Sequence, residues 1–173
     1  VTVGVTELAA PVTPTVSFAT QTTFGTGDAP QLMAFGDFNH DGKQDIVVTN
    51  YNDNSVSVLL GNGDGTFQQK LSYATGRGPV GVSVGDFDHD GKLDIAVANT
   101  GEKTVSILLG KSDGTFQSQT RYATGNLPFS ASVADVDNDG FQDLIIANHS
   151  GDNTISVLLG KGDGTFKSQM TYA

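Results

Sequence analysis

The sequence predicts an all-β protein built from three repeated units, each a sheet of four antiparallel strands. An acidic segment of nine residues occurs at 37–45, 86–94 and 135–143, so that successive copies start 49 residues apart. Between these segments, short runs rich in Val, Ile, Thr, Phe and Tyr alternate with glycine-rich turns, which is typical of strands and tight turns. Four strands per unit at a period near 49 residues favour the blades of a β-propeller.

The second copy of the unit shows the expected order of its strands. Val80, Val82 and Val84 alternate with small residues, which predicts a first strand that ends where the acidic segment begins. The continuous apolar run at 95–99 predicts a second strand buried on both faces. The third strand follows at 104–110.

An Asp-Gly pair then predicts a hairpin turn at Asp113 and Gly114, because glycine accepts the positive φ that such turns require. The fourth strand is expected at 116–122. The same turn recurs at Asp64 and Asp163. A single carboxylate at each turn favours a structural role over ion binding.

Three complete blades are expected at about 28–75, 77–124 and 126–173, and the third is one residue longer through an insertion around 149–153. Phe18 and Phe24 stand two periods before Phe116 and Tyr122, so residues 15–24 are expected to form an extra outer strand. Residues 1–14, in which Pro11 and Pro14 stiffen the end of an extended sequence, are interpreted as a linker or an edge strand.

The charge of the chain is concentrated in the acidic segments. Of the 17 aspartates, 11 lie in them, and the formal net charge is −10. Without a basic stripe to neutralise phosphates, we expect no nucleic-acid partner. No apolar run approaches the roughly 18 residues of a membrane span, so no membrane insertion is expected. The chain has no cysteine.

Each acidic segment places carboxylate or carboxamide oxygens at positions 1, 3, 5 and 9 and a glycine at position 6. Oxygens at alternate positions, a backbone carbonyl at position 7 and a glycine at the turn suit Ca²⁺. A solvated acidic turn is the alternative. Three copies in one register favour the cation, because several neighbouring carboxylates repel one another unless a cation neutralises them.

An EF-hand is a competing kind of calcium loop, but it requires a bidentate glutamate at position 12. Here position 12 is Val48, Val97 or Ile146, and the flanking residues have the period of strands. The predicted ligands of three Ca²⁺ sites are therefore the side chains of Asp37, Asn39, Asp41 and Asp45 with the carbonyl of Lys43; Asp86, Asp88, Asp90 and Asp94 with the carbonyl of Lys92; and Asp135, Asp137, Asp139 and Asp143 with the carbonyl of Phe141. The neutral Asn39 predicts that the first site is the weakest.

The acidic segments occur together with Gly-x-x-Pro segments at 27–30, 76–79 and 125–128 and with the block Leu-Leu-Gly-x-x-Asp-Gly-Thr-Phe at 108–116. In this combination the chain resembles the FG-GAP repeat of integrin α-subunits and the bacterial repeats called VCBS. The resemblance covers residues 15–173. It implies four-stranded blades around a central axis, with calcium in the hairpin between the first and second strands. Such propellers usually have seven blades, whereas three are complete here.

Catalytic residues are not evident in the sequence. His40 and His89 stand at position 4 of their loops and are expected to face solvent, and no serine or cysteine nucleophile can be assigned. Paired carboxylates of the glycosidase type are not excluded by sequence, although the carboxylates outside the loops are scattered singly.

The expected function is that of a non-enzymatic, calcium-stabilised binding or adhesion module whose ligand is a protein or a glycan. Loops of this kind suit millimolar extracellular calcium, so a secreted or cell-surface location is expected. One alternative is a lectin that uses Tyr51 as an aromatic platform. Another is an accessory propeller of a larger enzyme that acts on polysaccharide or lipid.

Three blades cannot close a ring, so the outer faces of the first and last blades should be exposed and apolar. Val47, Val56, Ile145 and Ile155 are expected on these faces. The sequence therefore predicts a homodimer of six blades, or a segment of a longer propeller array. Because the chain begins at Val1 without a signal peptide, we interpret it as a mature or excised segment.

Overall fold

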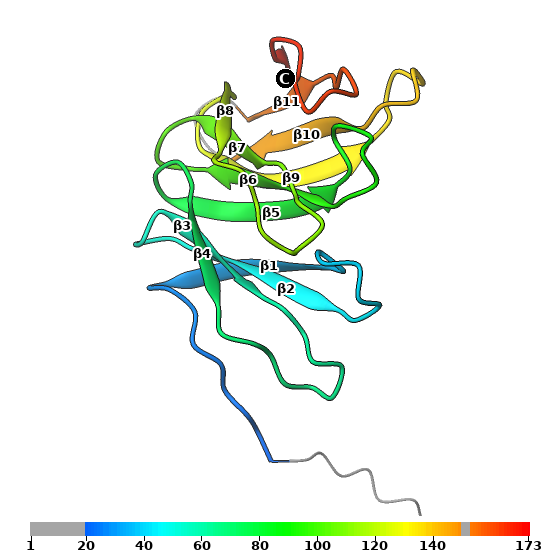
Figure 1. The fold of residues 1–173 in the computed structure, drawn as a ribbon. Coiled ribbons are helices and arrows are strands. Elements are labelled where there is room, and N and C mark those ends of the chain that lie inside the picture. The colour runs from blue at the N-terminus through cyan, green and yellow to red at the C-terminus, as the bar shows by residue number, and fades with distance from the viewer. Residues whose placement is uncertain (1–19, 150–152) are drawn as a thin grey trace, which may run out of the picture.

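The computed structural model covers residues 20–149 and 153–173 with three antiparallel sheets of four strands each (Figure 1). The first sheet contains β1 (Pro30–Gly36), β2 (Asp45–Asn50), β3 (Ser55–Leu59) and β4 (Leu71–Ala74). The second contains β5 (Pro79–Gly85), β6 (Asp94–Asn99), β7 (Thr104–Leu108) and β8 (Thr120–Ala123). The third contains β9 (Pro128–Ala134), β10 (Asp143–Asn148), β11 (Thr154–Leu158) and β12 (Met170–Tyr172). Within the described ranges no helix is long and apolar enough to cross a membrane.

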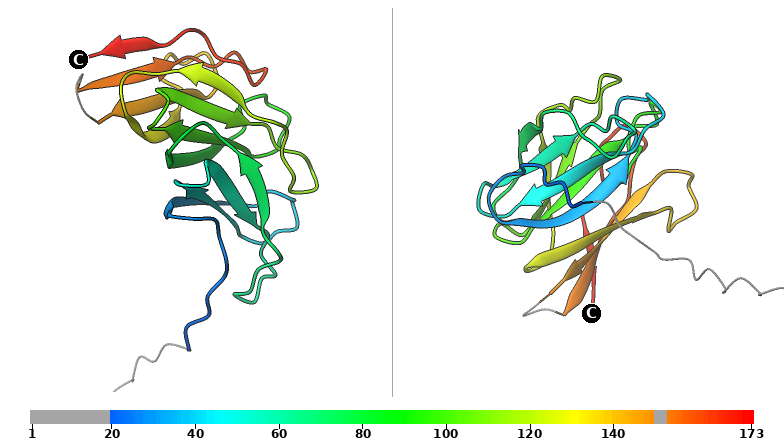
Figure 2. Two further views of the ribbon diagram at one scale, coloured as in Figure 1. Left: turned by 90° about the vertical axis from the view of Figure 1, so that its left-hand side faces the viewer. Right: turned by 90° about the horizontal axis from the view of Figure 1, so that it is seen from below.

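Each sheet is a meander, because consecutive strands pair with one another and no strand crosses to another sheet. The sheets lie one upon another in the order of the sequence, and their first strands β1, β5 and β9 are in contact (Figures 1 and 2). The predicted all-β repeat of four-stranded units is confirmed. The three sheets form an open row and not a closed ring.

Two apolar layers hold this row of sheets together. Between the first and second sheets, Phe38 packs edge-on against Phe116, with ring centroids 5.5 Å apart. Between the second and third sheets, Phe87 packs in the same way against Phe166, at 5.6 Å. The phenylalanine at position 2 of one acidic loop therefore reaches the phenylalanine that follows the Asp-Gly turn of the next sheet.

The middle sheet is covered on both sides, and every residue of β6 is buried, as the continuous apolar run predicted. Of the two outer faces, that of the last sheet agrees with the expectation, since Ile155 is exposed, whereas that of the first sheet does not. Val47 and Val56 are fully buried against the second sheet and are not exposed. The opposite face of the first sheet is the open one, and there Met33 and Phe35 are more than half exposed.

The fourth strands are shorter than predicted. Phe116 forms only an isolated bridge with Gly110, and β8 begins at Thr120. Between them, the side-chain oxygen of Gln119 accepts a hydrogen bond from the hydroxyl of Ser106, at 2.6 Å. A side chain turned onto the sheet thus takes the place of part of the backbone ladder.

The predicted N-terminal segments lie largely outside the described residues, which exclude 1–14 entirely and 15–19 of the expected extra strand. Residues 20–29 form no strand. Phe24 nevertheless lies edge-on against Phe67 of the first sheet, at 5.1 Å. Most of the insertion expected at 149–153 also falls outside the described part of the chain.

We predict that Phe87→Ala lowers the free energy of unfolding by about 3–5 kcal/mol, because it opens a cavity between two sheets. The equivalent residue of the third loop, Val136, is 47% exposed and faces no further sheet within residues 20–149 and 153–173. Val136→Ala is the matched control, and we expect it to cost less than about 1 kcal/mol. Urea denaturation of both variants measures the difference, and equal losses would contradict this role of position 2.

Candidate metal centre

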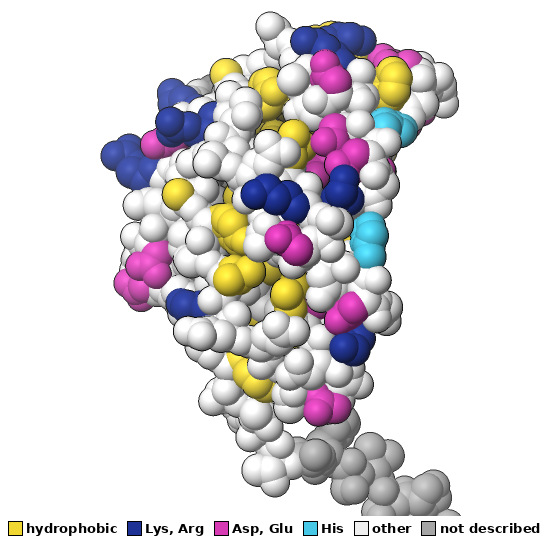
Figure 3. All heavy atoms as spheres, in the orientation of Figure 1, with side chains coloured by type: hydrophobic (Ala, Val, Ile, Leu, Met, Phe, Trp, Pro, Cys, Tyr) yellow, Lys and Arg dark blue, Asp and Glu magenta, His cyan; other side chains and the backbone are white. Residues whose placement is uncertain are grey.

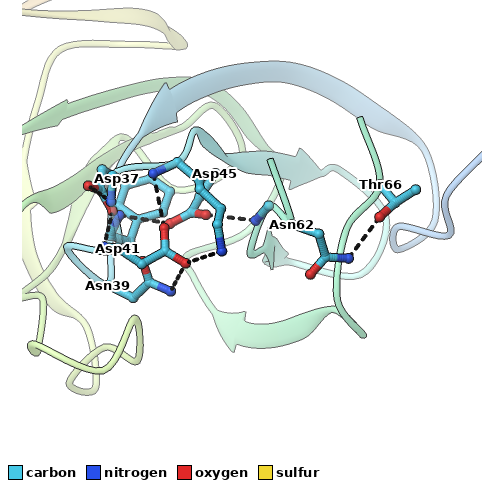
Figure 4. Close-up of polar contacts among 10 residues, drawn as sticks. Asp37, Asn39, Asp41, Asp45, Asn62 and Thr66 are labelled. Atoms are coloured by element: carbon cyan, nitrogen blue, oxygen red, sulfur yellow. Dashed lines mark hydrogen bonds and ion pairs between the residues drawn. The ribbon is translucent and has the colours of Figure 1, made fainter. Parts of the chain in front are cut away.

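Each acidic loop joins the first and second strands of its sheet and turns sharply through two residues with positive φ. In the second loop these are His89 at position 4, with a φ of 56°, and Gly91 at position 6, with a φ of 82°. Glycine adopts this conformation without steric cost, so the expected role of position 6 is confirmed. The turn brings the side chains of positions 1, 3, 5 and 9 to one side, as Figure 4 shows for Asp37, Asn39, Asp41 and Asp45.

The aspartate at position 9 is fully buried and binds backbone from two other segments. In the second loop, Oδ2 of Asp94 accepts from the N–H of Phe87 and Oδ1 from the N–H of Gly110, both at 2.7 Å. The same two bonds form at Asp45, from Phe38 (2.8 Å) and Gly61 (2.7 Å), and at Asp143, from Val136 (2.9 Å) and Gly160 (2.8 Å). Position 9 therefore ties the loop to the turn after the third strand.

Positions 1 and 3 bring further carboxylates to this buried group. One carboxylate oxygen from each of Asp86, Asp88 and Asp94 lies within 4.8 Å of the other two. Asp135, Asp137 and Asp143 form the same group in the third loop. In the first loop Asn39 stands at position 3, so the equivalent positions offer only two carboxylates.

The aspartate at position 5 lies outside these groups of three. Oδ1 of Asp90 accepts from the N–H of Lys92, at 3.0 Å, and its other oxygen forms an ion pair with the ammonium of Lys92. In the third loop Asp139 accepts from the N–H of Phe141, at 2.9 Å. The ligand roles of Asp41, Asp90 and Asp139, and of the carbonyls at position 7, stay predictions.

Burial and mutual repulsion change the acidity of the second group. Burial raises the pKa of Asp94 to about 6 against the two backbone N–H bonds that lower it, and the neighbouring Asp88 and Asp86 raise it further. Burial, followed by the charge of Asp90, also raises the pKa of Asp88. The ionised group is thus disfavoured in the fold, and a cation between the carboxylates would relieve this cost.

Neighbouring loops touch one another through position 4. The ring nitrogen Nε2 of His40 lies 2.9 Å from the carbonyl oxygen of Gly91, at position 6 of the next loop. His89 lies edge-on against Phe141 of the third loop, at 5.1 Å. Both histidines are exposed, as expected, but the sequence did not indicate these contacts. In Figure 3, acidic and histidine side chains lie along the right-hand side of the molecule.

A second recurring polar group, built around a buried asparagine in every sheet, was not predicted from the sequence. Asn50, Asn99 and Asn148 end the second strands, and all three are buried. The side-chain amide of Asn99 donates to the hydroxyls of Thr104 and Ser106, at 3.0 and 2.7 Å. The signal is the recurrence of Asn at one place in every unit, with Ser or Thr five to eight residues later.

Comparison with protein families gives three matches along the chain. The family described as the FG-GAP-like repeat matches residues 37–97, 86–146 and 135–173, which together span about four-fifths of the chain. The chain belongs to the FG-GAP-like repeat family. Each match of this family begins at an acidic loop, and the first two end inside the second strand of the following unit, so each of these FG-GAP-like matches spans parts of two neighbouring sheets.

Two solved structures are similar to the chain at low identity, and the first of them shares its fold. A crystal structure of a functionally unknown protein from Desulfotomaculum acetoxidans DSM 771 matches 82% of this chain and 41% of its own, with 19% identity and a TM-score of 0.63. The Photorhabdus luminescens Tc holotoxin pore matches 83% of this chain and 7% of its own, with 19% identity and a TM-score of 0.46. The chain therefore spans about two-fifths of the first of these proteins. No curated protein matches the sequence.

We predict opposite effects of Asp88→Asn with and without calcium. In chelator the substitution should raise the melting temperature, because it removes a carboxylate whose raised pKa shows that its ionised form is disfavoured in the fold. In excess calcium the affinity of the second loop should fall, because a charged ligand is lost. Calorimetry and thermal melting measure the two effects.

The chain offers a matched control at the same position of the first loop. Asn39→Asp should strengthen calcium binding there and lower stability in chelator, since it adds the carboxylate that the first group lacks. For each substitution, the change in stability should have one sign in chelator and the opposite sign in excess calcium. If the sign were the same in both conditions, the carboxylates would not form a cation site.

Calcium affinity of the second loop should fall as the pH is lowered through about 6, because protons then compete for Asp94. Below this pH we expect about a tenfold loss for each pH unit. The sign reverses for the metal-free protein: a carboxylate with a raised pKa favours folding increasingly as the pH falls from about 6 toward 3.8. Titration calorimetry from neutral pH to pH 5 tests this, and an affinity independent of pH would contradict it.

Proposed function

We propose that the acidic loops bind Ca²⁺ and that the chain is a calcium-stabilised binding module without enzymatic activity. The observation that carries this proposal is the group of Asp86, Asp88 and Asp94, with one buried carboxylate and two partly exposed ones within 4.8 Å of one another. The same group of carboxylates recurs in the third loop, which favours a cation site over a solvated acidic turn.

The donors favour calcium over transition metals. All three grouped side chains of each site are carboxylates, and hard oxygen donors suit Ca²⁺ or Mg²⁺, whereas zinc sites use Cys and His. A mixed set of carboxylates with Asn39 in the first loop is compatible with the flexible, oxygen-rich coordination of Ca²⁺. Mg²⁺ demands near-ideal octahedral geometry and usually retains several waters.

Bound calcium would act on stability through Asp94. This side chain already joins the start of the loop to the turn after the third strand. A cation that neutralises it together with Asp86 and Asp88 would strengthen the hairpin on which the rest of the blade is built. Structural loops of this kind work at millimolar calcium, which supports a secreted or cell-surface location.

We further propose that the module binds a protein or a glycan. Tyr51 is 41% exposed beside the loop that contains Gly78, and an exposed ring of this kind suits stacking on a sugar. A glycan array tests the sugar ligand, and loss of any signal in Tyr51→Ala would assign it to this ring.

Removal of calcium should lower thermal stability. A ligand at about 100 times its dissociation constant adds about 2.7 kcal/mol to the free energy of unfolding for each site. Melting curves in excess calcium and in chelator measure the sum, and titration with Mg²⁺ is the control for a general charge effect. Identical curves in calcium and in chelator would contradict the proposed sites.

A further inference from the structure

An aromatic contact recurs at the outer edge of each sheet. The ring of Tyr73 in β4 lies edge-on against Phe116 of the second sheet, with centroids 5.4 Å apart. Tyr122 in β8 meets Phe166 of the third sheet in the same way, also at 5.4 Å. The tyrosine of one outer strand therefore covers the phenylalanine after the Asp-Gly turn of the next sheet.

The first sheet has the same phenylalanine, but a different part of the chain covers it. Phe24 lies edge-on against Phe67 at 5.1 Å, although no sheet precedes the first one in the described residues. The hollow around this contact is lined by Thr23, Phe24 and Gly25 on one side and by residues 67–70 on the other. This arrangement repeats that of residues 72–74 with 116–119 in the second sheet. Phe24 thus takes the place of a tyrosine from a preceding outer strand.

The last sheet differs in the opposite way, because the tyrosine of its outer strand covers no phenylalanine among the described residues. Tyr172 in β12 corresponds to Tyr73 and Tyr122, but its ring is 51% exposed and packs against no phenylalanine in the described part of the chain. Its hydroxyl lies 3.6 Å from the sulfur of Met170. Among the described residues, Tyr172 is thus the outer-strand tyrosine that covers no neighbouring sheet.

Part of the outer face of the last sheet is apolar. A shallow hollow there is lined by Val136, Ile155, Val157, Leu159, Met170 and Tyr172, with Asp137 at its rim. Ile155 pairs with Tyr172 across β11 and β12, and both point away from the second sheet. The corresponding face of the second sheet, with Val105 and Ile107, is fully covered by the third sheet. Between consecutive sheets, this face is covered by the opposite face of the following sheet, which includes side chains of that sheet's first strand.

The open face of the first sheet is of the kind that covers a preceding sheet elsewhere in the molecule. Met33 and Phe35 in β1 correspond to Val82 and Val84 in β5, which pack against the preceding sheet. In the first sheet they are 55% and 54% exposed. The two ends of the row are thus the two halves of the contact that is formed twice inside it.

We propose that two copies of the chain associate head to tail, with the last sheet of each covering the first sheet of the other. The segment 20–27 then acts as a removable cap. In such a pair Tyr172 would take the position over Phe67 that Phe24 occupies, so the two rings compete for one place. Repeating this contact closes a ring of six blades with two-fold symmetry.

Competition between the rings predicts opposite effects of two substitutions. Phe24→Ala should tighten association, because it weakens the cap, and Tyr172→Ala should weaken association. An edge-on aromatic pair changes an equilibrium by about 2- to 10-fold, and we expect shifts of that size in the dissociation constant of the dimer. Sedimentation over a range of concentrations measures it for the full chain. Tyr51→Ala removes a similarly exposed ring that lies beside Gly78 and lines neither the hollow at Phe24 nor that at Tyr172, so it should leave association unchanged.

A second experiment tests the polarity of the contact. Phe35→Arg blocks the first sheet and Ile155→Arg blocks the last, and both side chains are exposed, so the apolar layers between the sheets are preserved. Each variant keeps one intact face. Alone, neither should form a closed dimer, because no copy can complete both contacts. An equimolar mixture should give a complex of two chains that is held by the one remaining pair of intact faces.

Other outcomes would overturn the proposal. If the two copies associated through the same face, only one of the two arginine variants would lose association. Mixing the two variants would then give no complex that contains one chain of each. A chain that stays monomeric at millimolar concentration, with or without Phe24→Ala, would show that the faces do not bind each other. Looser association of Phe24→Ala would show that Phe24 is part of the contact and does not compete with it.

Discussion

The buried aspartate that closes each acidic loop joins three parts of its sheet. Asp94 begins β6, and its carboxylate accepts one N–H from the start of the loop and another from the turn after β7. Because these bonds hold both ends of the loop, the carboxylates of positions 1 and 3 are brought within reach of position 9. The loop, the hairpin and the candidate cation site therefore depend on the same side chain.

This constraint has an electrostatic consequence. A carboxylate that is buried to make two backbone bonds loses hydration, and in the second loop its neighbours add repulsion, so its pKa rises to about 6. The second loop thus contains a site at which negative charge is costly without a counter-ion. The contact between His40 and Gly91 joins the first loop to the second.

The sequence repeat of 49 residues places an acidic loop in every sheet, and it also repeats the packing between neighbouring sheets. Position 2 of each loop points toward the next sheet, and its residue is buried where that sheet exists, as at Phe87, and exposed where it does not, as at Val136. An array of identical contacts leaves one half-contact at each end. Phe24 covers part of one end, and the outer face of the last sheet remains open.

The sequence by itself determined the strands, the turns and the composition of the acidic loops, because period-two patterns, Asp-Gly turns and turn glycines act over a few residues and recur every 49. Tertiary structure alone decided which faces meet. Val47 and Val56 were expected at an open face, but alternation separates the two faces of a strand without saying which one a neighbour covers. The contact of Phe24 with Phe67 likewise joins residues 43 positions apart, and only the packing of the first sheet brings them together.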